Sequence, residues 1–183
     1  MTPAEKYNLL EFHKWTFEAK YYVKVYKNFV IAPRVLFGYL GTYNRELGVS
    51  PFERFYLGGD GIQNFNLDGR TVHALRGYRQ AFIGSPFGSV VFDKFTLDFR
   101  QAITLSAMAN VWIHAFFEAG NAWGDAKDFN PFVLRRSVGG GIRVMMPMFG
   151  LLGVDYGYGM DDVYYGGSKL NGGIFHFMIG QEF

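Results

Sequence analysis

Apolar and polar residues alternate with a period of two along most of the chain. In residues 14–25 lysines and other polar residues separate an apolar series that contains Trp15, Phe17, Ala19, Tyr21, Val23 and Val25. Successive side chains of a strand point to opposite faces, so this segment predicts a strand with one apolar and one polar face. A strand of a soluble β-sandwich gives the same pattern, and alternation alone leaves both architectures open.

Six further segments predict strands, for about seven in all. They cover residues 29–40, 90–103, 109–123, 134–148, about 152–158 and 173–183. Pro33 lies inside the second strand, and because proline has no N–H for the ladder, we expect a bulge or a locally unpaired spot there. Three consecutive glycines at 139–141 predict sharp curvature or close packing in the fifth strand.

The connections between these strands alternate between short and long. Short turns fall near residues 26–28, 104–106 and 147–150, and longer loops span about 41–88, 125–131 and 161–172. Outer-membrane barrels have short periplasmic turns and long extracellular loops, whereas a soluble sandwich has no reason to keep this asymmetry. The sequence therefore predicts an all-β fold, an antiparallel transmembrane β-barrel of which this chain forms a partial barrel or curved sheet.

Composition agrees with this prediction. The chain contains 20 Phe, 12 Tyr, 3 Trp and 24 Gly, which suits aromatic girdles and kinked strands. It has no run of 18 apolar residues, the length that a membrane-spanning helix needs. The N-terminal MTPAEKYNLL does not resemble a signal peptide. We therefore expect residues 1–183 to be the C-terminal portion of an outer-membrane barrel domain from a longer exported chain.

The segment 41–88 is far too long for a simple hairpin. Loops longer than about 12–15 residues are usually functional or disordered. This one carries too many apolar side chains for a disordered tether, namely Phe52, Phe55, Tyr56, Leu57, Leu75 and Tyr78. We expect it to be an extracellular loop that folds into the lumen, with Arg76 of Leu75-Arg76-Gly77-Tyr78 as its buried charge.

A buried arginine needs partners, and two carboxylates are candidates. Asp98 and Glu118 lie on the predicted polar faces of the two strands that follow the loop. The planar guanidinium suits carboxylates, and a buried charge without a partner is costly. The alternative is that Arg76 is solvated, Gly77 and Tyr78 shape a turn, and the carboxylates are ordinary lumen residues. Spacing alone favours this alternative.

Four motifs carry a resemblance to the BamA-type outer-membrane insertases. PFERFYLGG (51–59) followed by LRGY (75–78) resembles the sixth extracellular loop of that family. FFEAGNAW (116–123) is similar to its acidic-Gly-x-x-Trp strand end. GIRVMMPMFGLLGVDYGYGM (141–160) resembles the hairpin before the last strand, and IFHFMIGQEF (174–183) resembles the last strand itself. The motifs occur in the family's order over nearly the whole chain.

The resemblance implies an outer-membrane barrel of about 16 strands, preceded by periplasmic POTRA domains, that inserts client β-barrel proteins into the outer membrane. It implies a loop latch formed by Leu75, Arg76, Gly77 and Tyr78, in which the arginine meets Asp98 and Glu118 in the lumen. The implied partners are outer-membrane lipids, client barrels and accessory outer-membrane lipoproteins. The chain departs from the family pattern by lacking the POTRA domains and the first strands.

The last strand has two interpretations that can both hold. Phe175, Phe177, Ile179 and the terminal Phe183 alternate along it. They resemble the C-terminal signal by which outer-membrane barrels are recognised, and the family implies that this strand forms a lateral seam. The simpler interpretation is that it is a lipid-facing strand.

Other functions of the same or different classes remain open. A polypeptide-secretion translocator or a TamA-like factor of the same superfamily shares the loop motif, and a passive porin or adhesin barrel is a further alternative. No Ser-His-Asp or Cys-His arrangement stands out, so we expect a non-enzyme. The chain has no cysteine, its four histidines are scattered singly, and its net charge is only +2. We therefore expect no metal, no cofactor and no nucleic-acid partner.

Overall fold

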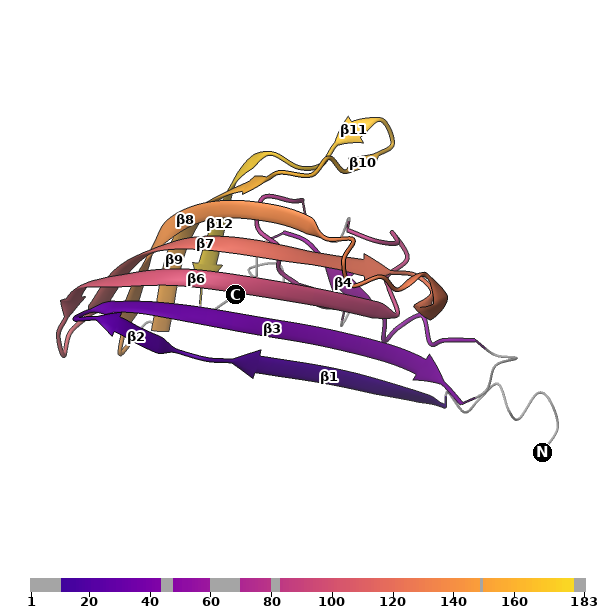
Figure 1. The fold of residues 1–183 in the computed structure, drawn as a ribbon, viewed down its shortest axis with the longest axis horizontal. Coiled ribbons are helices and arrows are strands. Elements are labelled where there is room, and N and C mark those ends of the chain that lie inside the picture. Colours follow the sequence, from indigo (N-terminus) through magenta and orange to yellow (C-terminus); the bar gives the residue numbers. More distant parts are fainter. Residues whose placement is uncertain (1–10, 44–47, 60–69, 80–82, 149, 180–183) are drawn as a thin grey trace.

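The structure is a computed structural model that describes residues 11–43, 48–59, 70–79, 83–148 and 150–179. Its main feature is an antiparallel sheet with the strand order β1-β3-β6-β7-β8-β9-β12, and β2 also pairs with β3 (Figure 1). The strands of this sheet are β1 (Phe12–Lys20), β2 (Val23–Tyr26), β3 (Phe29–Thr42), β6 (Val91–Leu105), β7 (Asn110–Trp123), β8 (Arg135–Met146), β9 (Gly150–Gly159) and β12 (Gly173–Ile179). The predicted all-β, antiparallel fold is confirmed.

The sheet is curved and open. Within the described residues β1 and β12 lie at its two edges and do not pair with each other. Short turns join β2 to β3, β6 to β7 and β8 to β9 at one end, and the long connections lie at the other (Figure 1). No helix in the described part of the chain is long and apolar enough to cross a membrane.

Pro33 affects the neighbouring strand rather than its own. β3 continues through Pro33, which stands opposite Leu97 of β6. On the other side of β3, the predicted strand 14–25 is interrupted at Tyr21 and Tyr22, between β1 and β2. Proline cannot donate to this neighbour, although its carbonyl still accepts from the Tyr21 N–H at 3.0 Å. The expected local loss of pairing therefore falls in the partner strand.

The two faces of the sheet differ in chemistry as the alternation predicts. One cross-strand row on the outer face consists of Ile113, Ile142, Val154 and Phe177, which the strand register places side by side. These side chains are all exposed, at 38–54 %. Asp98, Glu118 and Asp155 point to the opposite, concave face and are buried. An apolar outward face around a polar interior is the arrangement of a transmembrane barrel wall.

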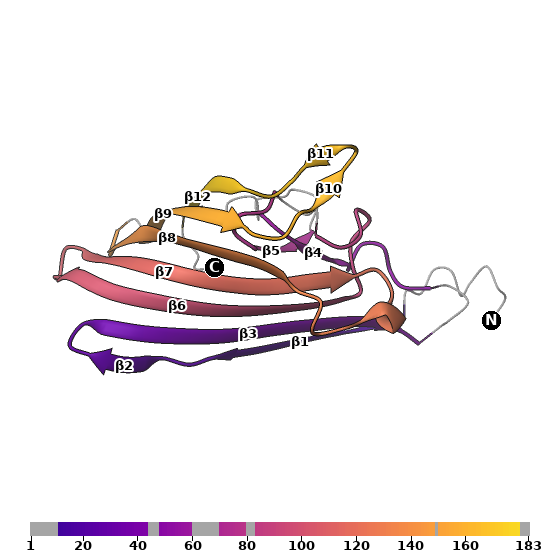
Figure 2. The ribbon, with the colours of Figure 1, turned by 45° about the horizontal axis from the view of Figure 1, so that its top comes forward.

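The segment between β3 and β6 folds back onto the sheet. It contains the parallel pair β4 (Phe55–Leu57) and β5 (Thr71–His73), which lies to one side of the sheet in Figure 2. Single bridges join Phe55 to Ser89 and Leu57 to Ile83. The apolar core forms between this segment and the long-loop ends of β3, β6 and β7, from Leu36, Leu40, Phe55, Leu57, Leu75, Tyr78, Ile83, Val90, Val91, Phe92, Ala122 and Trp123.

The remaining described elements lie outside the main sheet. A short 3-10 helix, η2 (Ala126–Asp128), occupies the connection after β7. The hairpin of β10 (Tyr164–Tyr165) and β11 (Ser168–Lys169) projects from the connection between β9 and β12 (Figures 1 and 2). It leads directly into β12, the edge strand.

Candidate functional site

Arg76 lies on the concave face of the sheet. Beneath it, three adjacent rows of inward residues run across the strands. The first row includes Glu118 and the third includes Asp155. The middle row contains Phe116, Gly139 and Gly157, which are paired in that order across β7, β8 and β9. Arg76 sits over the middle row with a carboxylate on either side, and its side chain is 1 % exposed.

Both ends of the Arg76 guanidinium are occupied by charged partners. Nη2 donates to Glu118 Oε1 at 2.9 Å, and Nη1 donates to Asp155 Oδ2 at 2.7 Å. The other oxygen of Glu118 accepts from the Arg76 backbone N–H at 2.9 Å. Both carboxylates are fully buried, so these are charge-assisted hydrogen bonds away from water. Burial opposes the charged form, but Glu118 and then Asp155 and Asp98 outweigh it and raise the pKa of Arg76.

The middle row forms a cradle for the arginine. Arg76 Cζ lies 3.3 Å from the centre of the Phe116 ring, in a cation–π contact. A side chain at Gly157 would meet the Gly77 nitrogen at 2.8 Å and Arg76 Cβ at 3.0 Å. One at Gly139 would collide with the Tyr156 carbonyl and the edge of the Phe116 ring. The glycines therefore provide the room that the loop needs. This is the close packing that the run at 139–141 predicts.

The residues around Arg76 also have defined positions. Leu75 is fully buried in the apolar core and bridges to Gly59. Gly77 has φ +84°, and a Cβ there would collide with the backbone of β9, so only glycine fits. Its N–H donates to His176 Nε2 of β12 at 2.9 Å. The Tyr78 hydroxyl donates to the Arg136 carbonyl at 2.6 Å, and burial raises the pKa of this phenol to about 12.

The structure brings together Arg76 and Glu118, as the family resemblance implies, but it places Asp98 one step away. Asp98 Oδ1 pairs with His114 Nδ1 at 2.9 Å, and Asp98 Oδ2 accepts from Arg100 at 2.8 Å. His114 Nε2 in turn pairs with Asp155 Oδ1 at 2.9 Å. Asp98 therefore reaches the arginine site through His114 and Asp155.

Asp155 is the partner that sequence reasoning missed. It pairs with Arg76 and His114, and it also forms a two-pronged ion pair with Arg143. Alternation places Asp155 on the polar face of β9, where the nearest inward positions, Gly153 and Gly157, are glycines. A lone carboxylate among glycines was the available signal, but its proximity to the loop depends on strand register that the sequence does not give.

Lys94 extends the charged network toward the loop. Its Nζ lies 2.9 Å from Glu118 Oε1, on the same oxygen that receives Arg76. The same Nζ donates to the Ala74 carbonyl at 2.6 Å, two residues before Arg76. One lysine of β6 therefore holds both the loop backbone and the carboxylate that binds the loop arginine.

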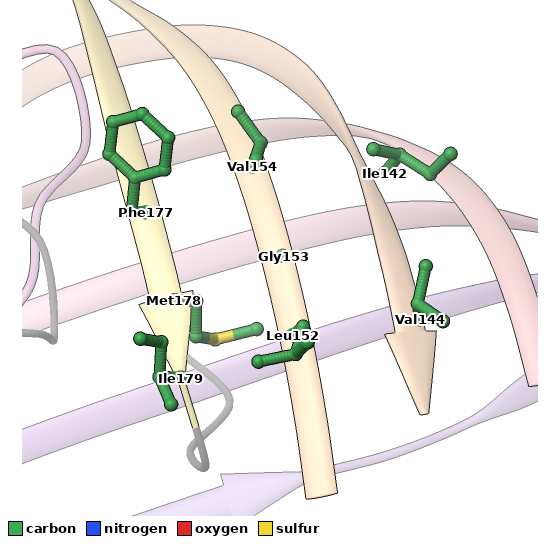
Figure 3. Close-up of a pocket in the computed structure, with 8 residues that line it drawn as sticks. All are labelled: Ile142, Val144, Leu152, Gly153, Val154, Phe177, Met178 and Ile179. Carbon is green, nitrogen blue, oxygen red and sulfur yellow. The ribbon is translucent and has the colours of Figure 1, made fainter. Parts of the chain in front are cut away.

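The residues predicted for the last strand lie on the outer face. Phe175, Phe177 and Ile179 are exposed at 54–63 %, and Phe183 lies outside the described residues. Next to them, a shallow apolar groove of about 260 Å³ runs across β8, β9 and β12 (Figure 3). It is lined by Ile142, Val144, Leu152, Gly153, Val154, Phe177, Met178 and Ile179. Apart from Gly153 and Met178, which lie at inward positions, the lining of this groove belongs to the lipid-facing surface.

A curved antiparallel sheet, apolar outside and polar inside, with a loop docked on its concave face, defines a β-barrel protein of the outer membrane. The particular family follows from comparison of the sequence with protein-family models. The chain belongs to the Omp85 superfamily, because the model of the Omp85 superfamily domain matches residues 6–183.

Solved structures agree with this assignment. The structure of BamA from Haemophilus ducreyi lacking POTRA domains 1–3 superimposes with a TM-score of 0.67 at 17 % sequence identity. The match covers 90 % of this chain and 34 % of that one, so the chain spans about a third of that BamA structure. Comparison with curated proteins gave no match. The resemblance to the C-terminal part of a BamA-type barrel is confirmed at the level of family and fold.

Proposed function

We propose that this chain is the C-terminal part of an insertase barrel that assembles client β-barrel proteins in the outer membrane. The observation that carries the proposal is the buried network in which Arg76 joins the loop to Glu118 and Asp155. Membership of the Omp85 superfamily supports outer-membrane protein insertion or secretion. In this proposal the buried network holds the loop in place during that process. Its partners would be membrane lipids, client barrels and accessory outer-membrane lipoproteins.

The proposed mechanism involves strand pairing rather than covalent chemistry. β12 lies at an edge of the sheet. An edge strand presents backbone N–H and C=O groups to which another strand can be added. Gly172 and Gly173 at its start favour a weak seam, which can open sideways and accept a client strand. A bilayer thinned beside a short seam lowers the cost of insertion.

The proposed role of Arg76 is that of a latch. It holds the loop segment Leu75–Tyr78 on the concave face and keeps the lumen ordered while the seam opens. A passive barrel gains nothing from this arrangement, because burying a charged network is costly and is retained where it fixes a specific conformation. A secretion translocator would use the same latch, and the test must separate these two functions.

Arg76→Ala in the full-length protein tests the proposal. The substitution leaves Glu118 and Asp155 buried without the loop charge, so we expect the loop to become protease-sensitive and client barrels to fall several-fold in outer membranes. Arg70→Ala is the matched control, since Arg70 is an exposed arginine of the same loop. The measurements are quantitative immunoblots of client barrels and limited proteolysis of the loop.

The outcomes separate the alternatives. Normal client levels together with a protease-resistant loop would contradict the latch. Normal client levels with a secreted protein retained in the periplasm would favour the translocator. A fall in client levels in Arg76→Ala, but not in Arg70→Ala, supports the insertase.

A further inference from the structure

The loop motif pairs directly with the segment that leads into β12. The Gly172 N–H donates to the Gly77 carbonyl at 3.2 Å, and the Arg79 N–H donates to the Leu170 carbonyl at 2.9 Å. Between these bonds Tyr78 stands opposite Asn171 in an antiparallel bridge. The loop therefore forms one antiparallel bridge with the chain just before the edge strand begins.

One side chain of β12 also reaches the loop. His176 is 1 % exposed, and its Nε2 accepts the Gly77 N–H at 2.9 Å. The acceptor nitrogen carries no proton, so the proton of the neutral imidazole is on Nδ1. The loop backbone approaches the backbone of β9 this closely because residue 77 is glycine, since a Cβ at this position would collide with β9.

Two successive N–H groups of the loop therefore bind to different parts of the sheet. The Arg76 N–H donates to Glu118 on β7, and the Gly77 N–H donates to His176 on β12. These strands are not neighbours, because β8 and β9 lie between them. Hydrogen bonds from a single stretch of loop backbone thus connect β7, in the middle of the sheet, to the edge strand β12.

We propose that His176 is a positioning residue that couples docking of the loop to the position of β12. Release of the loop and freeing of β12 for a client strand are then linked events. Coupling between two equilibria is reciprocal, so loosening β12 loosens the loop and loosening the loop loosens β12. The inference rests on the proposed function only in assigning β12 the role of the seam.

Two substitutions separate this coupling from simple packing. His176→Phe keeps an aromatic ring but has no acceptor for the Gly77 N–H, which a buried donor needs. His176→Gln keeps an acceptor oxygen but has no ring. If His176 only fills space, the Phe variant behaves normally and the Gln variant does not. If His176 couples the loop to the strand, the Gln variant behaves normally and the Phe variant does not.

The experiment uses the full-length protein, folded in bilayers and without a client. The 183 residues contain no cysteine, so Val72→Cys gives a buried reporter thiol on the loop, with any cysteine elsewhere replaced by serine. The rate of maleimide modification reports undocking of the loop, and amide hydrogen exchange reports opening of β12. We expect His176→Phe to accelerate both by about tenfold and His176→Gln to stay within about twofold of the parent.

Met178→Leu is the matched control, because Met178 is the next inward side chain of the same strand and is also buried. It should change neither rate. Unchanged rates in His176→Phe, or a faster loop rate with β12 exchange unaffected, would overturn the coupling. If His176→Phe does not fold, Arg76→Ala provides the test, because the coupling is reciprocal. In that variant amide hydrogen exchange in β12 must rise at least as much as in β7. No client is present, so this result and the client-assembly test can fail independently.

Discussion

At the scale of single residues, Asp155 carries more of the charge compensation in this network than Asp98 does. It is fully buried and faces Arg76, Arg143 and His114 at once. Asp98 faces His114 and Arg100, and both its side chain and that of Arg100 keep some contact with solvent. Removing the charge of Asp155 therefore leaves more buried positive charge uncompensated.

We expect Asp155→Asn to weaken loop docking by about 3 kcal/mol, the range for breaking a buried ion pair. Asp98→Asn should cost about 1 kcal/mol, because Arg100 can turn to water. The measurement is hydrogen exchange of the peptide that contains Arg76, compared between the two variants. Equal protection in both would contradict this ranking.

The sequence predicts this site only in part, for a physical reason. Alternation shows which face of its strand a residue occupies, and it placed Glu118 and Asp155 on the polar face. It does not show which residues of β7 and β9 stand level with one another. That information lies in the cross-strand register, and the register depends on backbone pairing along the whole sheet.

At the scale of elements, β8 shows how one strand serves two surfaces. Gly139 faces inward beneath the Phe116 ring, and an added Cβ would collide with the Tyr156 carbonyl of β9 and with the edge of that ring. Gly140 faces outward, and an added Cβ there meets the His114 carbonyl at 3.0 Å and little else. Adjacent glycines therefore have different functions, and only Gly139 supports the arginine cradle.

Gly139→Ala should strain the pairing of β8 with β9 at the Tyr156 carbonyl and displace the Phe116 ring, and with the ring the Arg76 guanidinium that lies on it. We expect a destabilisation of about 1–3 kcal/mol, the usual cost of overpacking, and faster proteolysis of the loop. Gly140→Ala is the matched control and should leave the loop protected. The measurement is the proteolysis rate of folded protein in both variants. A loop equally sensitive in both would indicate a general effect of glycine replacement on the strand.

The longer strands were predictable and the shorter ones were not. The segments that became β3, β6, β7, β8, β9 and β12 each alternate over enough residues to show a period of two. β4, β5, β10 and β11 have two or three residues each, too few to show any period. Their positions depend on contacts with distant parts of the chain.

At the scale of the whole molecule, docking of the loop on the sheet depends on pH through His73 of β5. Burial, together with the positive charges of Lys94, Lys14 and Arg34, lowers the pKa of His73 to about 4. An exposed histidine titrates near 6.5. Between these values the undocked loop binds a proton that the docked loop does not, so docking weakens as pH falls.

We therefore expect full docking above about pH 6.5 and progressive loss toward pH 4, on the order of 2–3 kcal/mol. His73→Phe should remove this part of the acid sensitivity, because it keeps the stacking on Phe92, at 4.2 Å between ring centres, without a titrating group. Proteolysis of the loop across this pH range checks the expectation. Identical pH profiles of parent and variant would contradict it.

The position of the apolar core has a mechanical consequence. The core fastens the long-loop ends of β3, β6 and β7, whereas β2 and the last residues of β6 at the short-turn end are exposed. Segments with few buried apolar contacts open most easily. We therefore expect the surrounding bilayer to bend the short-turn end of the sheet more than the long-loop end, so that the arginine site keeps its geometry.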